Sequence, residues 1–289
     1  MRRVESVAPG GERPVELITS RRNPLVARLR ALQQGRGRRE QGLLLLEGTH
    51  LLQEVLRLGL APELVLSTPR WGEAHGPLLA ALPAVTRRQP VGEEVLAAVA
   101  TTEHPDGVVL TLPLTALPVA GPAPQFVLAL DQLQDPGNLG TLLRTALAAG
   151  VQQVWLGGGA DPLQPKVLRA SAGAALALPL LRDAGREGLA ERLHGARAAG
   201  QQVVATVVAG GGGASGGAST AQPYWQLDWN LPTVVLLGNE GAGLDSELAA
   251  LASHRVTIPH SAAVESLNVA VAAGPLLLER WRQGRMPAN

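Results

Sequence analysis

Short apolar runs alternate with helical patterns through the second half of the chain, and this alternation constrains the fold more than any other feature of the sequence. The runs at 126–130, 154–156, 202–208, 233–237 and 255–258 have the length of buried strands. Helices are predicted at 139–147, 166–174, 187–199 and 266–282, and 176–180 is predicted to be extended. Strands that alternate with helices favour a mostly parallel sheet with helices on both faces. The sequence therefore predicts an α/β domain over residues 125–289.

The best-defined unit of this domain spans residues 126–150. Its apolar run is followed by a polar turn and then by leucines and alanines at helical spacing, and Gly150 is placed to end the helix. Asn138 is predicted to cap the helix, and Arg144 lies off the apolar stripe. A strand, a polar turn and a helix N-terminus form a natural site for an anionic or nucleotide-like ligand. An ordinary strand–helix unit with a capping Asn and a solvated Arg explains this stretch alone equally well.

Three polar clusters follow predicted strands. The first contains Asn138, Gly140 and Arg144, the second is Gly238-Asn239-Glu240-Gly241, and the third is Ile258-Pro259 followed by Ser266-Leu267-Asn268. Open α/β sheets bind their ligands at the carboxyl ends of the strands, so these clusters are candidates for one site. Each cluster alone is a weak signal, since such turns are more often loops or helix caps.

The first half of the chain reads as a smaller α/β domain over residues 15–113. Residues 114–124 are rich in Pro, Ala and Gly and are predicted to be a linker, and residues 1–14 are predicted to be disordered. The first 39 residues hold ten Arg and three acidic residues, although the net charge of the whole chain is only +1. A basic surface of this kind favours a polyanionic partner, whereas a solvated charged helix is the simpler explanation. The candidate contacts are Arg21, Arg22, Arg28, Arg36, Arg38 and Arg39.

The final predicted helix carries more apolar surface than one core-facing side requires. Leu276, Leu277 and Leu278 are adjacent, and Trp281 follows them. Surplus apolar surface of this kind often closes a twofold interface. Pro275 lies within the same pattern and is expected to bend the helix. A second feature, the glycine-rich stretch at 210–218, is predicted to be a flexible loop.

Composition excludes several classes of protein. The chain has no Cys, which excludes disulfides and thiolate metal sites and fits a reducing cytoplasm. No run of about 18 apolar residues is present, so a membrane partner is not expected. No His/Asp/Glu cluster suggests a metal, and His254 and His260 are expected to be surface or packing residues. No G-x-G-x-x-G motif follows a strand, so the glycines at 157–159 do not favour a dinucleotide enzyme.

The order and spacing of the three clusters carry more information than each cluster alone. The series N-x-G-x-x-x-R, L-G-N-E-G-x-G-L, and I-P followed by S-L-N-V resembles the three motifs of the SpoU-type 2′-O-ribose RNA methyltransferases of the SPOUT superfamily. The segments ITSRRNPLVARLRAL, LLLLEGTHLLQEVL and PDGVV resemble the N-terminal substrate-binding domain of that family, which is similar to a small RNA-binding ribosomal-protein fold. Together the resemblance covers nearly the whole chain.

The resemblance implies S-adenosylmethionine as methyl donor and an RNA ribose 2′-hydroxyl as acceptor, with ribosomal RNA favoured over transfer RNA. It also implies a C-terminal trefoil knot, a homodimer and no metal. The catalytic residues that it implies are Asn138, Arg144, Glu240, Ser266 and Asn268. The cofactor-binding residues that it implies are Gly238, Asn239, Gly241, Ile258, Pro259 and Leu267. A catalytically silent RNA-binding protein with the same fold and a transfer RNA 2′-O-methyltransferase remain as alternatives.

Overall fold

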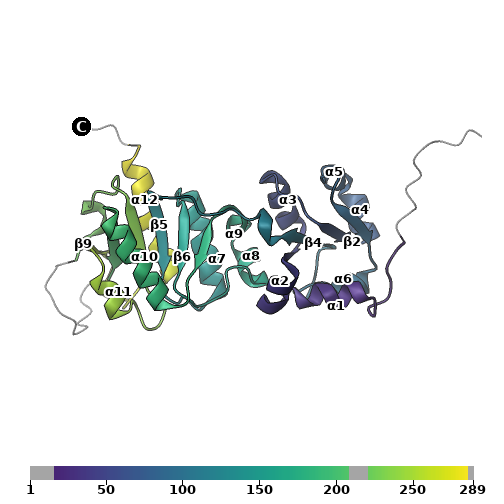
Figure 1. The fold of residues 1–289 in the computed structure, drawn as a ribbon, viewed down its shortest axis with the longest axis horizontal. Coiled ribbons are helices and arrows are strands. Elements are labelled where there is room, and N and C mark those ends of the chain that lie inside the picture. Colours follow the sequence, from purple (N-terminus) through teal and green to yellow (C-terminus); the bar gives the residue numbers. More distant parts are fainter. Residues whose placement is uncertain (1–15, 208–220, 286–289) are drawn as a thin grey trace, which may run out of the picture.

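The computed structural model describes residues 16–207 and 221–285, which form two β-sheets covered by helices (Figure 1). The predicted disorder of residues 1–14 and the glycine loop predicted at 210–218 therefore lie outside the described residues. The two sheets lie side by side along the long axis of the molecule, joined by the segment predicted as a linker. That segment begins with a short 3-10 helix, η1, at Leu114–Ala116.

The N-terminal half contains a four-stranded mixed sheet in the order β1-β4-β2-β3. Strand β4 runs antiparallel to β1 and β2, whereas β2 and β3 are parallel. Alternate residues of β1 face opposite cores, so that Leu43 and Leu45 pack with α1 and α6, and Leu44 and Leu46 pack with α3. The elements are α1 (Pro24–Ala31), α2 (Gly35–Gln41), β1 (Leu43–Glu47), α3 (Thr49–Arg57), β2 (Leu64–Ser67), α4 (Pro69–Ala74), α5 (Gly76–Ala80), β3 (Arg87–Pro90), α6 (Glu93–Val99) and β4 (Val108–Pro113).

The C-terminal half contains a seven-stranded sheet in the order β7-β6-β5-β10-β8-β11-β9. Every strand pairing in it is parallel among the described residues, which confirms the predicted parallel sheet. Its elements are β5 (Phe126–Leu130), α7 (Pro136–Ala148), β6 (Gln153–Leu156), α8 (Pro165–Ala170), α9 (Ala174–Ala177), β7 (Leu180–Arg182), α10 (Arg186–Ala198), β8 (Gln202–Thr206), β9 (Gln222–Pro223), η2 (Tyr224–Gln226), β10 (Thr233–Leu237), α11 (Ser246–Ala250), β11 (His254–Thr257) and α12 (Val269–Gln283).

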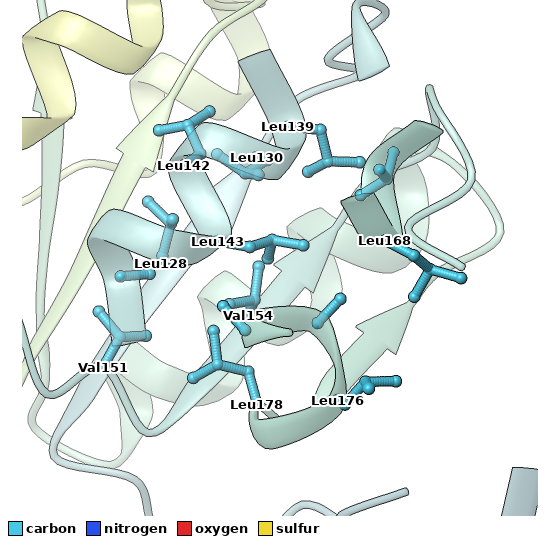
Figure 2. Packing of buried hydrophobic residues seen from close by; sticks show 14 of the residues in the cluster. Leu128, Leu130, Leu139, Leu142, Leu143, Val151, Val154, Leu168, Leu176 and Leu178 are labelled. Carbon is cyan, nitrogen blue, oxygen red and sulfur yellow. The ribbon is translucent and has the colours of Figure 1, made fainter. Parts of the chain in front are cut away.

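Helices cover both faces of this sheet, as predicted. Buried residues of α7, α8, α9 and α12 share one core with β5 and β6, and residues of α10 and α11 share a second core on the other face. Figure 2 shows the first core, in which Leu143 of α7 lies next to Val154 of β6 at the centre of the cluster. The same core continues into β1 and α3 of the N-terminal half, so the two sheets share one body of buried apolar side chains.

Two details of α7 differ from the sequence prediction. The cap is Asp135, whose Oδ1 accepts from the Asn138 N–H at 2.7 Å, and Asn138 lies inside the first turn of the helix. Since Pro136 has a fixed φ and no N–H, it is suited to the first helical position, and this starts the helix earlier than Asn138 would. Leu147, the last residue of the predicted apolar stripe, is 36% exposed. Gly150 has a φ of 78° just after the helix, as expected for a C-terminal glycine.

Other element predictions need correction. The helix predicted at 166–174 is divided into α8 and α9, and the segment predicted to be extended at 176–180 begins inside α9. Helix α12 starts at Val269, because the side chain of Asn268 caps it, and it continues through Pro275 to Gln283. Leu276 and Leu277 are fully buried, so only Leu278 of the three adjacent leucines adds exposed apolar surface.

Candidate active site

A cleft of about 820 Å³ opens at the carboxyl ends of β8, β10 and β11. It contains members of all three polar clusters, which come from α7, from the loop after β10 and from the segment between β11 and α12. Of the residues predicted as catalytic or cofactor-binding, only Arg144 and Pro259 do not line it. Those that line it are Asn138, Gly238, Asn239, Glu240, Gly241, Ile258, Ser266, Leu267 and Asn268.

A chain of side-chain hydrogen bonds joins the three clusters. Asn268 Nδ2 donates to Asn138 Oδ1 at 3.1 Å, and Asn138 Nδ2 donates to Glu240 Oε1 at 3.3 Å. Asn268 also caps α12, because its Oδ1 accepts from Ala270 N at 2.9 Å. With its oxygen and nitrogen both engaged, the Asn138 amide has one defined orientation at the edge of the cleft.

The carboxylate of Glu240 is also held by the loop after β5. Its Oε2 accepts from Gln134 N at 3.2 Å and its Oε1 accepts from Asp135 N at 3.1 Å. Partial desolvation, the largest single influence, raises the pKa of the Glu240 carboxyl although the residue as a whole is exposed, but the hydrogen bonds from backbone amides and from Asn138 together outweigh it. The pKa of Glu240 therefore lies below its ordinary value, and the side chain is a carboxylate at neutral pH.

The loop after β10 is held by its own backbone and by Asn239. Asn239 Nδ2 donates to Gln132 O at 2.8 Å, while its Oδ1 accepts from Gly241 N at 2.9 Å. A Cβ on Gly238 would lie 2.3 Å from Leu244 N and 2.4 Å from the carbonyl carbon of Gly243. Gly238 is therefore required by the close approach of its own loop, before any ligand is considered.

Several residues at or near the cleft are not among those predicted from the sequence. Thr206 and Val207, at the end of β8, line the cleft, and so does His260, which was expected to be a surface or packing residue. The placement of the first two at a strand's carboxyl end is the only signal in the sequence that could have found them. Asp131 is fully buried at the end of β5, where its Oδ1 accepts from Arg186 Nε at 2.8 Å.

Ser266 and Arg144 are the two predicted catalytic residues without a side-chain partner. The side chain of Ser266 is exposed at the cleft and makes no hydrogen bond to any described residue. Arg144 lies on the exposed side of α7, six positions after Asn138, and pairs with no described residue either. Both side chains are therefore available to a ligand or to another chain.

The predicted basic cluster is divided by the structure. The side chains of Arg21, Arg22 and Arg39 are exposed and bond to no described residue. Arg28 pairs with Glu63, and Arg36 pairs with Glu40. The prediction of an exposed contact is wrong for Arg38, which is 4% exposed and is bound to Asp161 of the C-terminal half. In Figure 1, α2 lies where the two halves meet, and α1 extends from it toward the far end of the N-terminal half.

Neither a metal centre nor a membrane span is found in the described part of the chain. No three His, Asp or Glu side chains there are grouped as metal ligands would be. Likewise, none of the helices within residues 16–207 and 221–285 is both long and apolar enough to cross a bilayer.

Comparison with known proteins gives matches over almost the full length. The model of the SpoU rRNA Methylase family matches residues 125–278, and that of the MRM3-like substrate binding domain matches residues 23–110. An uncharacterized tRNA/rRNA methyltransferase of Synechocystis is 44% identical over 92% of this chain and 93% of its own length. The 23S rRNA (guanosine(2553)-2′-O)-methyltransferase of Bacillus subtilis is 32% identical over 90% of this chain and 97% of its own length. The crystal structure of an AdoMet-bound rRNA methyltransferase from Sinorhizobium meliloti is similar with a TM-score of 0.75 and 33% identity, covering 94% of this chain and 99% of that one.

Proposed function

The chain belongs to the SpoU rRNA methylase family, and we propose that its cleft is where S-adenosylmethionine and the substrate RNA meet. The protein is an S-adenosylmethionine-dependent methyltransferase that modifies a ribose 2′-hydroxyl of RNA. Ribosomal RNA is favoured over transfer RNA, since several relatives are named for ribosomal RNA alone. The match to methyltransferases over both halves of the chain disfavours a catalytically silent RNA-binding protein.

The cleft fits the cofactor in size and in chemistry. Small-molecule sites usually have volumes of about 300–1,000 Å³ and combine apolar walls with a few polar groups, and the cleft lies within this range. Backbone groups of Gly238, Asn239 and Gly241 offer the polar contacts, and Ile258 and Leu267 offer the apolar ones, with Pro259 fixing the backbone beside Ile258. When bound, S-adenosylmethionine supplies a methyl group on a positively charged sulfur.

The hydrogen-bonded amide of Asn138 is the observation that carries the catalytic assignment. Methyl transfer requires the acceptor oxygen directly behind the methyl group, so the placement of the ribose is a large part of catalysis. An amide that is fixed by Glu240 on one side and Asn268 on the other can hold a ribose without reorganising. Ser266, whose hydroxyl lies at the same cleft and bonds to no described residue, is suited to bind a further polar group of the RNA.

Arg144 acts on the developing negative charge of the ribose oxygen and on a neighbouring phosphate. A guanidinium stays protonated in proteins, so Arg144 is not the base, and an RNA phosphate beside the hydroxyl is a suitable proton acceptor. Because Arg144 bonds to no described residue, both N–H edges of its guanidinium are available to bind the phosphate and the ribose oxygen.

An Arg144→Ala variant tests this function. We expect the single-turnover rate of labelled methyl transfer to RNA to fall by a factor on the order of 10²–10³, the range for losing one such donor, while the affinity for S-adenosylmethionine stays unchanged. Arg144→Lys should rescue poorly, because a point charge does not reproduce the bidentate fork. Arg197→Ala, which removes an exposed Arg from α10 on the opposite face of the sheet, is the matched control. A near-normal rate for Arg144→Ala would remove Arg144 from the active site.

The two halves of the chain serve as two domains with different tasks. We assign residues 15–113 to RNA binding, 114–124 to the connection and 125–289 to methyl transfer, in line with the separate family models that match each half. The exposed side chains of Arg21, Arg22 and Arg39 are the phosphate contacts that remain, because Arg38 is buried and Arg28 and Arg36 are paired with Glu63 and Glu40. A cytoplasmic location stays a prediction.

The polypeptide between β11 and α12 belongs to a trefoil knot in this proposal. Support comes from the return of the chain from β11, near one edge of the sheet, to α12, which packs against α7 and β10 nearer its centre. The segment that makes this return lines the same cleft as the loop after β10. A knot there would hold the cofactor-binding segments together without a separate lid.

A homodimer completes the proposed enzyme. The outer side of α12 exposes Val271, Leu278 and Trp281, which follow helical spacing, and α12 packs beside α7, where Leu147 is exposed as well. A second copy of the chain would cover this surface. Arg144 lies on the exposed side of α7 and outside the cleft of its own chain, so in a dimer it is available to the partner's cleft.

A further inference from the structure

Arg38 crosses from the N-terminal to the C-terminal half of the molecule. Its Nη1 donates to the carbonyl oxygens of Leu32 and Gln33, each at 3.0 Å, and its Nη2 donates to Asp161 Oδ2. The position of α2 is itself tightly fixed, because a Cβ on Gly37 would lie 2.1 Å from Ala31 O. The guanidinium therefore belongs rigidly to the N-terminal half, and the carboxylate that it binds belongs to the loop between β6 and α8.

The second carboxylate oxygen of Asp161 contacts residues of the C-terminal half. Its Oδ1 accepts from Leu163 N at 3.0 Å and lies 3.7 Å from Arg182 Nη1. Arg182 Nη2 also donates to Gly159 O at 2.9 Å. The loop at 157–163 is thus tied to the carboxylate at both its glycine end and its helix end.

The same loop presses directly on the loop after β5. Ala160 N donates to Leu133 O at 2.8 Å, and a Cβ on Gly159 would lie 2.2 Å from Leu133 O. Gln132, in the second loop, has a φ of 50°, which residues other than glycine rarely adopt. A strained backbone of this kind persists only where its surroundings hold it, and the glycine loop is the backbone packed against it.

The loop after β5 leads directly to the catalytic amide. Its next two residues, Gln134 and Asp135, donate their backbone N–H groups to Glu240, and Glu240 accepts from Asn138. A continuous series of contacts therefore joins the N-terminal half to Asn138 through two backbone loops.

We infer that Arg38 and Asp161 are positioning residues for methyl transfer, which set the orientation of Asn138 according to how the N-terminal half is seated. The inference rests on the proposed role of Glu240 and Asn138 at the cleft. In such an enzyme the residues of the cleft are correctly oriented only when the RNA-binding half is packed against the C-terminal half. RNA binding and methyl transfer are then coupled through the contact between Arg38 and Asp161. Neither residue touches the cleft, so their effect on rate passes entirely through the two loops.

A double-mutant cycle distinguishes positioning from a purely structural role. Asp161→Asn weakens the ion pair with Arg38, and Asp183→Asn is a matched control that weakens the ion pair with Arg192, which is outside this series of contacts although Asp183 follows Arg182 in the chain. Each is combined with Glu240→Gln, and single-turnover rates are measured in the full-length protein at saturating RNA and S-adenosylmethionine. We expect Asp161→Asn to lower the rate about 2- to 30-fold, the range for residues along such couplings, without changing cofactor affinity. Its effect should shrink when Glu240→Gln is already present, whereas Asp183→Asn should leave the rate unchanged in either background.

Amide hydrogen exchange provides the second readout. Exchange within residues 131–135 should accelerate in Asp161→Asn and not in Asp183→Asn. If Asp161→Asn loses the circular dichroism of the folded protein, Arg38→Lys, which keeps the charge but not the fork, goes through the same cycle. A normal rate for Glu240→Gln would overturn the proposed site itself. A reduced rate for Glu240→Gln, together with effects of Asp161→Asn that simply multiply or with unchanged exchange at 131–135, would overturn this inference alone.

Discussion

Replacing Glu240 with Gln changes one atom and disturbs three hydrogen bonds. In the native cleft both carboxylate oxygens are acceptors, for Gln134 N at 3.2 Å and for Asp135 N and Asn138 Nδ2 at 3.1 and 3.3 Å. A Gln side chain has one acceptor oxygen, so its NH₂ group must face either the Gln134 N–H or the other two donors. In the best arrangement the Gln oxygen accepts neutral hydrogen bonds from Asp135 N and Asn138 Nδ2, and the Gln134 N–H loses its acceptor.

The magnitude follows from this count. Hydrogen bonds to charged groups contribute about 1.5–3 kcal/mol and neutral ones about 0.5–1.5 kcal/mol. Glu240 is an exposed residue, so solvent weakens each of these hydrogen bonds. We therefore expect the free energy that favours the correct orientation of Asn138 to fall by only about 1–2 kcal/mol. Since about 1.4 kcal/mol is a factor of ten, the fraction of correctly oriented Asn138 should fall about 5- to 30-fold. The rate of methyl transfer should fall by the same factor.

The carboxylate also makes a prediction about pH. Because the pKa of Glu240 is lowered in the folded protein, its contribution to stability is complete above the ordinary Glu pKa of about 4.3 and is lost as the pH falls through the lower, folded value. The stability difference between the wild-type protein and Glu240→Gln should therefore be constant near neutral pH and should shrink in acid. Urea unfolding at a series of pH values measures it.

Single-turnover transfer of labelled methyl to RNA, at saturating RNA and cofactor, is the assay for the rate. Glu247→Gln, an exposed Glu of α11 with no side-chain bond to a described residue, is the matched control. A Glu240→Gln enzyme that keeps half or more of the wild-type rate would show that Asn138 does not depend on this carboxylate. A difference in stability that persists unchanged in acid would refute the lowered pKa.

Three further predictions follow from the cleft and the surfaces around it. Gly238→Ala should lower both the urea midpoint and the cofactor affinity, because its Cβ would lie 2.3 Å from the backbone of its own loop. Gly241→Ala should keep the wild-type midpoint, because the nearest atom to its Cβ is 3.7 Å away. Urea unfolding measures the midpoints, and calorimetry measures the affinity. Arg39→Ala should lower the slope of log K against log salt for RNA binding by about 0.7–0.9, and an unaltered slope would make Arg39 a solvated surface residue. Leu278→Glu should convert the proposed dimer to monomers in sedimentation equilibrium, and a wild-type monomer at micromolar concentration would refute the dimer.

The strands and the meeting of the three clusters could be predicted because both depend on local pattern. Short apolar runs separated by helices leave little choice except a parallel sheet, and β5 and β10 have the predicted bounds. In a parallel sheet the carboxyl ends of strands share one edge. The residues after β10 and β11 therefore had to come close to those after β5, and the cleft lies at that edge.

The sequence could not show the features that depend on contacts between residues far apart in the chain. Arg38 belongs to a run of arginines and looks like its neighbours, yet its burial is decided by Asp161, 123 positions later in the chain. The resemblance implies a cofactor-binding role for Gly238, while the closest neighbours of its missing Cβ are in its own loop. Ser and Asn are both common N-cap residue types, so the sequence could not show that Asn268 rather than Ser266 caps α12 and also binds Asn138.

The side chain of Asn268 makes two kinds of hydrogen bond that a side chain with one polar atom could not make together. Its Oδ1 accepts from the N–H groups at the start of α12, and its Nδ2 donates to Asn138, so one side chain serves both the helix and the proposed catalytic amide. A Ser in that place could cap the helix through its oxygen but would have no second polar atom for Asn138. The register of α12 is thereby tied to the geometry of the cleft. Since the exposed apolar side of α12 is also the proposed dimer surface, a second copy packed there would stabilise the helix on which the orientation of Asn138 depends.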